Sequence, residues 1–140
     1  MNRNTRPIAI TLLALVAVSS HAQAKHRAPK PAPVDAAAQG DPAAGSEVFK
    51  THCFACHGKE GGGTALAPPL LGVVGSKAAT SPFSAYSPAL KASGAVWSPA
   101  KLDSFLAGPG KLIPGTRMAV SLPKVDDRQN LIAYLATLKK

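Results

Sequence analysis

The sequence predicts an all-α fold of four to five short helices joined by long loops. Segments with apolar residues at helical spacing begin at an Asp or Ser followed by Pro, and no stretch alternates well enough to be a strand. The rest of the chain is rich in turn residues, with 12 Gly and 13 Pro among 140 residues. Loops this long in a compact domain need a surface to pack against.

The first helix is expected to open the folded domain. Asp41 suits the N-cap and Pro42 the first helical position, so this helix should run to about His52. Gly45 and Phe49 are four residues apart and therefore lie on one face of the helix.

Two short helices should follow a long irregular stretch. Three consecutive Gly and a Pro pair forbid regular structure over residues 58–82 apart from short turns. Ser87 then begins a helix that Gly94 ends, and Ser98 begins another that Gly108 ends. The apolar stripe of this second short helix consists of Leu102, Phe105 and Leu106.

The last helix should close the domain after a loop over residues 111–120. Asp126 and Asp127 suit a helix N-terminus, and Lys139 and Lys140 suit its C-terminal end. The apolar residues at helical spacing in this segment are Leu131, Ile132, Leu135 and Leu138.

Residues 1–24 have the layout of an export signal. Arg3 and Arg6 precede an apolar stretch over 8–18, and an A-x-A cleavage site ends at Ala24. The apolar stretch has about half of the roughly 20 residues that a membrane-spanning helix needs. We therefore expect cleavage after Ala24 and a periplasmic protein, and a permanent anchor is the weaker interpretation.

The exported chain should start at Lys25 with a tail and continue as one domain. Residues 25–40 are rich in Pro and Ala and predict a flexible tail, and residues 41–140 form the domain. The formal net charge is +9, which favours acidic partners. Nucleic acid is excluded as a partner, because aromatic residues make up only 5% of the chain and no groove-reading motif occurs.

Cys53-Phe54-Ala55-Cys56-His57 is the attachment sequence of a c-type haem, with two thioethers to the porphyrin and an imidazole to the iron. A zinc site would need a second Cys/His pair, and a thioredoxin-like motif would need a βαβ context. The two cysteines are the only ones in the chain, so no disulfide is expected. A haem would also give the long loops their packing surface.

Met118 is the candidate for the sixth iron ligand. It is the only methionine left once the leader is removed, and it lies in a Pro-Gly loop rather than on a helical apolar face. The competing ligands are His52, which adjoins the motif and would point away, and His26 in the tail. We expect the metal ligands to be His57 and Met118.

The region from Gly45 to Leu138 resembles mitochondrial-type class I cytochrome c, including its soluble bacterial relatives. Besides the haem motif, the resemblance rests on Gly45, Phe49, Pro68, Leu70, Gly72-Val73-Val74-Gly75, Phe83, Tyr86, Trp97, Pro114 to Met118, and Leu131 to Leu135. It implies the class I cytochrome c fold, with its helices and loops wrapped around one covalently bound haem c. It also implies that the last helix crosses the first at Gly45, with Phe49 and Tyr134 filling the crossing.

The resemblance extends to residues around the haem. It implies that the Pro68 carbonyl accepts a hydrogen bond from Nδ1 of His57, which fixes the tautomer of the ring. It also implies that Tyr86 and Trp97 hydrogen-bond a haem propionate, although ordinary aromatic core is the alternative. The expected cofactor-binding residues are Cys53, Cys56, His57, Pro68, Tyr86, Trp97 and Met118.

Three positions depart from the family pattern. Phe105 replaces a common tyrosine, Leu90 a usual asparagine and Ser76 an arginine. Each change removes a polar group near the haem. We expect a drier pocket, an altered midpoint potential and a shifted alkaline transition.

Two strong axial ligands leave no open coordination position on the iron, which favours electron transfer over catalysis. We expect a soluble periplasmic electron carrier that is not an enzyme, has no stable membrane anchor and is a monomer. One alternative is a dedicated cytochrome c subunit of a periplasmic dehydrogenase or oxidase complex. Another is a haem peroxidase or sensor, which would need Met118 to dissociate easily. The cations expected to dock on acidic patches of redox partners are Lys59, Lys111, Arg117 and Lys124, with Lys50 and Lys77 as more generic surface charge.

Overall fold

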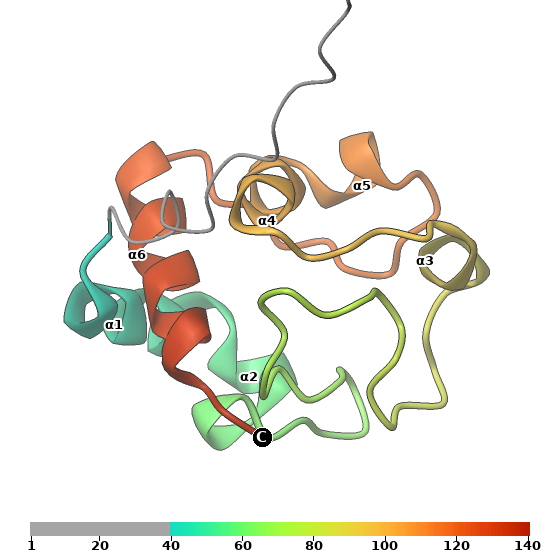
Figure 1. The fold of residues 1–140 in the computed structure, drawn as a ribbon, viewed down its shortest axis with the longest axis horizontal. Coiled ribbons are helices and arrows are strands. Elements are labelled where there is room, and N and C mark those ends of the chain that lie inside the picture. The colour runs from blue at the N-terminus through green and yellow to red at the C-terminus, as the bar shows by residue number, and fades with distance from the viewer. Residues whose placement is uncertain (1–39) are drawn as a thin grey trace, which may run out of the picture. The chain divides into compact units, whose positions relative to one another are not determined.

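The computed structural model describes residues 40–140, which contain six α-helices and one 3-10 turn (Figure 1). These elements are α1 Pro42–His52, α2 Phe54–His57, η2 Lys59–Gly61, α3 Pro88–Ala92, α4 Pro99–Ala107, α5 Pro109–Leu112 and α6 Val125–Thr137. Residues 40–140 form no strand beyond one isolated bridge between Lys77 and Val96. The all-α prediction is therefore confirmed. The predicted leader and nearly all of the predicted tail lie outside the described residues.

The helices begin at the capping residues that the sequence indicates. The Asp41 carboxylate accepts a hydrogen bond of 2.8 Å from the Ala43 amide at the start of α1. Ser87 and Ser98 cap α3 and α4 in the same way, and a Pro follows each cap. None of the helices in this part of the chain is long and apolar enough to span a membrane.

Two predicted boundaries are wrong. The loop expected over residues 111–120 starts later, because Pro109 begins a new helical turn and residues 109–112 form the short helix α5. Helix α6 ends at Thr137, so Lys139 and Lys140 do not lie in its last turn. Leu138 is extended, and its carbonyl accepts a hydrogen bond of 2.7 Å from the amide of Gly72. This long-range bond takes Leu138 out of the helix.

The crossing of α1 and α6 holds the domain together (Figure 1). A Cβ atom on Gly45 would lie 1.9 Å from the carbonyl oxygen of Asn130 and 2.8 Å from Cβ of Tyr134. The rings of Phe49 and Tyr134 pack beside this contact with centroids 5.4 Å apart. The predicted crossing at Gly45 is therefore confirmed, and it fixes where α1 delivers the haem motif.

Candidate haem site

A cavity of about 490 Å³ brings all of the predicted cofactor-binding residues together. Its volume is in the range of small-molecule and cofactor sites, roughly 300–1,000 Å³. Its walls come from α2, α4, α6 and the loops between them, and they are mostly apolar. The predicted residues that line it are Cys53, Cys56, His57, Pro68, Tyr86, Trp97 and Met118.

The haem motif forms a tight turn directly after α1. The amides of Cys56 and His57 both donate to the carbonyl of Cys53, at 3.1 and 2.8 Å. No disulfide joins the two cysteines of the motif, and Cys53 is buried whereas Cys56 is exposed. Burial raises the pKa of the Cys53 thiol to about 11.

His57 is held by the carbonyl of Pro68, with Nδ1 2.8 Å from the oxygen. A carbonyl only accepts hydrogen bonds, so Nδ1 carries the proton and Nε2 keeps its lone pair. Burial lowers the pKa of His57, while the hydrogen bond to Pro68 acts in the opposite direction. The neutral imidazole that results is the form that binds a metal ion.

A closed loop delivers the Pro68 carbonyl to His57. The Leu70 amide donates to the Gly61 carbonyl at 2.7 Å, and the Gly63 amide donates to the His57 carbonyl at the same distance. Gly63 has a φ of +86°, and a Cβ there would lie 2.7 Å from the nitrogen of Pro69. The run of glycines in the sequence therefore lets the proline pair approach the haem motif closely.

Met118 lies half-buried in the loop between α5 and α6 and packs against the apolar core. The turn before it is closed by a hydrogen bond of 3.1 Å from the Thr116 amide to the Ile113 carbonyl. Next to it, Arg117 donates to the carbonyl of Ala85 at 3.0 Å. The loop thus presents the thioether to the same cavity as the imidazole.

Tyr86 and Trp97 line the cavity, and each also contacts another residue of the protein. The Tyr86 hydroxyl is hydrogen-bonded to the Ser81 hydroxyl. Trp97 is buried, and its ring lies 4.8 Å from that of Phe105. Their hydrogen bonds to a propionate remain a prediction.

The three departures from the family pattern all line the cavity. Phe105 is buried against Trp97, and Leu90 adds a second apolar side chain. The Ser76 hydroxyl is occupied, because it donates to the carbonyl of Val73 at 2.8 Å. Phe105 and Leu90 make this part of the wall apolar, as the prediction of a drier pocket requires. Its consequence for the midpoint potential stays a prediction.

Sequence reasoning missed one buried charge beside the site. Arg128 in α6 is only 7% exposed, and its guanidinium forms an ion pair with Asp103 in α4, with Nε 2.8 Å from Oδ1. The signal was its spacing, because Arg128 falls three and four residues before the buried Leu131 and Ile132. A charge on the buried face of a helix needs partners nearby.

The donor set fits a c-type haem. The cavity contains two thiols at Cys-x-x-Cys spacing, a neutral imidazole whose tautomer is fixed, and a thioether. Apolar walls suit a flat, apolar cofactor, and no disulfide competes for the two thiols. In the described part of the chain no buried polar side-chain atom lacks a hydrogen-bond partner.

Comparisons of the sequence and the structure with known proteins point to the same cofactor. The model of the Cytochrome c family matches residues 42–139. The chain is 48% identical to cytochrome c of Tetrahymena pyriformis over 101 residues, which are 71% of this chain and 91% of that one. It is 45% identical to cytochrome c2 of Rhodomicrobium vannielii over 104 residues, 71% of this chain and 81% of that one. The solved structure of cytochrome cH from Methylobacterium extorquens matches 70% of this chain and 99% of its own, with a TM-score of 0.64 and 41% identity. The chain therefore belongs to the cytochrome c family and carries one covalently bound haem c.

Proposed function

We propose that this cytochrome c is a soluble periplasmic electron carrier whose haem iron has His57 and Met118 as its two axial ligands. The observation that carries the proposal is the meeting of both side chains in one apolar cavity. The haem, when bound, supplies one-electron chemistry. The protein's own residues bind the haem, orient the ligands and exclude water. The export signal over residues 1–24 supports the periplasmic location, with cleavage after Ala24.

The arrangement favours electron transfer because neither ligand has to move. The carbonyl of Pro68 fixes the ring of His57, and the loop that carries Met118 is tied to neighbouring segments at both ends. The soft thioether of methionine raises the reduction potential relative to a second nitrogen ligand. A closed site leaves no position for a substrate, which sets the carrier apart from a peroxidase or a sensor.

The test is whether carbon monoxide reaches the iron. We expect the visible spectrum of the reduced, exported protein to stay unchanged when carbon monoxide is added, because Met118 occupies the sixth position. Intact mass of the same sample should show one covalent haem on a chain that starts at Lys25. Ready binding of carbon monoxide by the native protein would contradict the carrier and favour a sensor or peroxidase.

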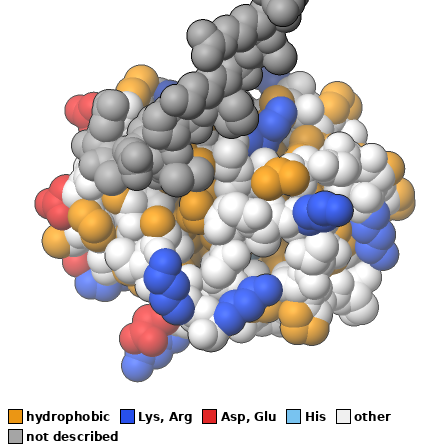
Figure 2. Space-filling model, in the orientation of Figure 1, with side chains coloured by type: hydrophobic (Ala, Val, Ile, Leu, Met, Phe, Trp, Pro, Cys, Tyr) orange, Lys and Arg blue, Asp and Glu red, His pale blue; other side chains and the backbone are white. Residues whose placement is uncertain are grey.

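We further propose that redox partners dock around the cavity through its cationic residues. Of the four cations that the sequence suggested, only Arg117 lines the cavity, and it is joined there by Lys77 and Lys140. Figure 2 shows Lys and Arg side chains at several places on one face of the molecule. Lys77, considered a generic charge from sequence, is therefore a better docking candidate than Lys111.

The variant Lys77→Glu should slow electron exchange with an acidic redox partner. We expect the second-order rate constant at low ionic strength to fall roughly twofold or more, because one steering charge is reversed. The difference from the native protein should fade as salt screens the surface. Stopped-flow measurements across a salt series check this.

The matched control is Lys101→Glu, an equal charge reversal at an exposed residue of α4 that does not line the cavity. It should leave the rate close to that of the native protein. Equal slowing by both variants would mean that total charge matters and the cavity rim does not.

A further inference from the structure

The segment that follows Met118 is not fixed by backbone hydrogen bonds of its own. Among the residues that the structure describes, the backbone of residues 119–121 makes no hydrogen bond to the rest of the protein. Ala119 and Val120 line the cavity beside Met118, and Val120 is 38% exposed. The position of the thioether therefore depends on the contacts at the two ends of this segment.

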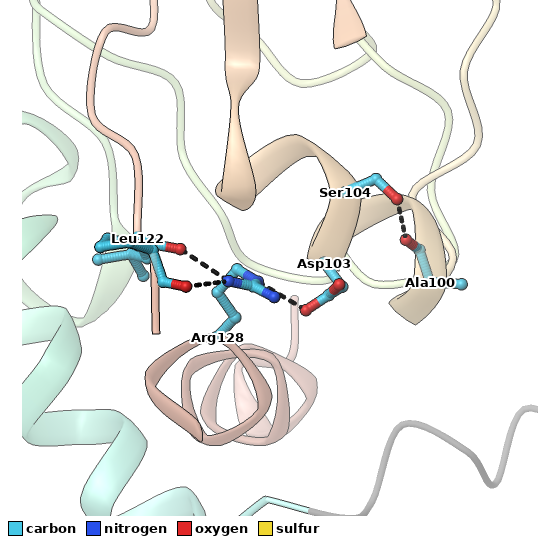
Figure 3. A network of polar contacts seen from close by, with 6 residues as sticks. Ala100, Asp103, Ser104, Leu122 and Arg128 are labelled. Atoms are coloured by element: carbon cyan, nitrogen blue, oxygen red, sulfur yellow. Dashed lines mark hydrogen bonds and ion pairs between the residues drawn. The ribbon is translucent and has the colours of Figure 1, made fainter. Parts of the chain in front are cut away.

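The end nearer α6 is held by Arg128. Its Nη1 donates to the carbonyls of Leu122 and Pro123, at 2.9 Å each (Figure 3). Its Nε donates to the carboxylate of Asp103 in α4 at 2.8 Å, which fixes the plane of the guanidinium. We call these contacts of Arg128 with Leu122, Pro123 and Asp103 the clamp. The clamp joins α6, α4 and the segment after Met118.

A second bond acts on the same residue. The amide of Leu122 donates to the carbonyl of Leu106 at 2.8 Å, and Leu106 itself lines the cavity. Leu122 is 2% exposed, so both of its backbone groups are paired away from water. A buried carbonyl that loses such a partner is costly to leave unpaired.

The other end of the segment is held more weakly. Two bonds lie within the loop itself, from the Thr116 amide to the Ile113 carbonyl at 3.1 Å and from the Met118 amide to Oγ1 of Thr116 at 3.4 Å. The contact with another segment is one hydrogen bond of 3.0 Å from Arg117 to the carbonyl of Ala85, and it is exposed to solvent. Water competes for both groups there, whereas Arg128 is only 7% exposed and its hydrogen bond to the Leu122 carbonyl is buried. The buried clamp is therefore the stronger of the two.

We propose that Arg128 is a positioning residue for Met118: by holding the carbonyls of Leu122 and Pro123, it keeps the loop closed and the thioether on the iron. This inference rests on the proposed ligation by Met118. It assigns to a residue of α6 the control of how readily the sixth position opens. Without the clamp the loop loosens from α6, while the hydrogen bond from Leu122 to Leu106 and the rest of the fold persist.

The test is the affinity of the ferric protein for added imidazole, which binds only when Met118 leaves. The variant Arg128→Met keeps an apolar stem and removes every donor. We expect its imidazole affinity to be about tenfold higher than that of the native protein or more, as loss of charge-assisted hydrogen bonds implies. Amide hydrogen exchange of residues 119–122 should quicken in the same variant.

Two milder variants test the same contacts with less risk of unfolding the protein. Asp103→Asn keeps the shape of the ion-pair partner, whose side chain is 39% exposed, and removes only its charge. We expect a smaller rise in imidazole affinity in the same direction. The variant Arg128→Lys, which keeps the charge but cannot reach all three acceptors, should fall between the native protein and Arg128→Met.

Two controls decide what a positive result means. Ile132→Ala removes a buried side chain of α6 that does not line the cavity, so it lowers the stability of the domain without touching the clamp. If it raises imidazole affinity as much as Arg128→Met at equal loss of stability, the positioning role is overturned. An affinity of Arg128→Met equal to that of the native protein overturns it as well. If the native protein already binds imidazole as tightly as Met118→Ala, the ligation by Met118 fails, and this inference fails with it.

Discussion

Replacing Gly45 with alanine is expected to destabilise the folded domain by about 2–3 kcal/mol. The added Cβ would lie 1.9 Å from the carbonyl oxygen of Asn130, and a backbone atom cannot rotate away from it. Helices α1 and α6 must therefore separate, which opens the contact between Phe49 and Tyr134. This cost outweighs the gain of roughly 1 kcal/mol that alanine brings to the interior of a helix.

The chain contains a matched control for this substitution. Gly110 in α5 has an ordinary negative φ, and a Cβ placed on it meets nothing within 4 Å. Gly110→Ala should therefore leave the free energy of unfolding within about 0.5 kcal/mol of the native value. Urea unfolding of both haem-loaded variants checks the pair. Equal stabilities would show that the helix crossing tolerates a wider separation.

The crossing also explains why a change at Gly45 should reach the haem. Cys53 follows the last residue of α1, and its amide donates to the carbonyl of Phe49 at 2.8 Å. A shift of α1 against α6 therefore moves the thiol that anchors one side of the cofactor. The same glycine that closes the core sets where the haem motif begins.

Local signals in the sequence were sufficient for most of the helices. Asp41, Ser87 and Ser98 each precede a proline, and each caps a helix in the structure. These signals act within a few residues, so they are visible in the sequence alone. The run from Pro109 to Leu112 was missed because a proline ends one helix and begins another with equal ease.

Long-range contacts were harder to predict. Leu138 has the spacing of a helical residue, but its carbonyl pairs with the amide of Gly72, a partner far away in the sequence. The spacing of Arg128 places it on the buried face of α6, but its partners Leu122 and Asp103 become visible only in the fold. In both cases the deciding interaction joins segments whose proximity only the fold establishes.

At the haem site, the resemblance to the cytochrome c family predicted a long-range contact that local signals in the sequence could not. The pairing of His57 with Pro68 spans a loop whose shape the spacing alone does not give, and the structure shows the hydrogen bond. The roles of Tyr86 and Trp97 toward a propionate depend on the cofactor itself and stay predictions. Arg128, which hydrogen-bonds the carbonyls of Leu122 and Pro123, matches no pattern of haem ligands.

Met118→Ala should produce the largest change in function. With the thioether gone, the reduced protein should bind carbon monoxide, and the midpoint potential should fall by on the order of 0.1 V or more. The fold should persist, because Met118 is only partly buried and lies outside the crossing of α1 and α6. Visible spectra with carbon monoxide and a redox titration measure both effects.

Val120→Ala is the matched control, since Val120 lines the same cavity two residues later and has no atom that could bind iron. It should leave carbon monoxide binding unchanged and shift the midpoint potential only slightly. Similar behaviour of the two variants would mean that the loop shapes the cavity without supplying a ligand. A change confined to Met118→Ala would show that one thioether closes the sixth position and makes this haem a carrier of electrons.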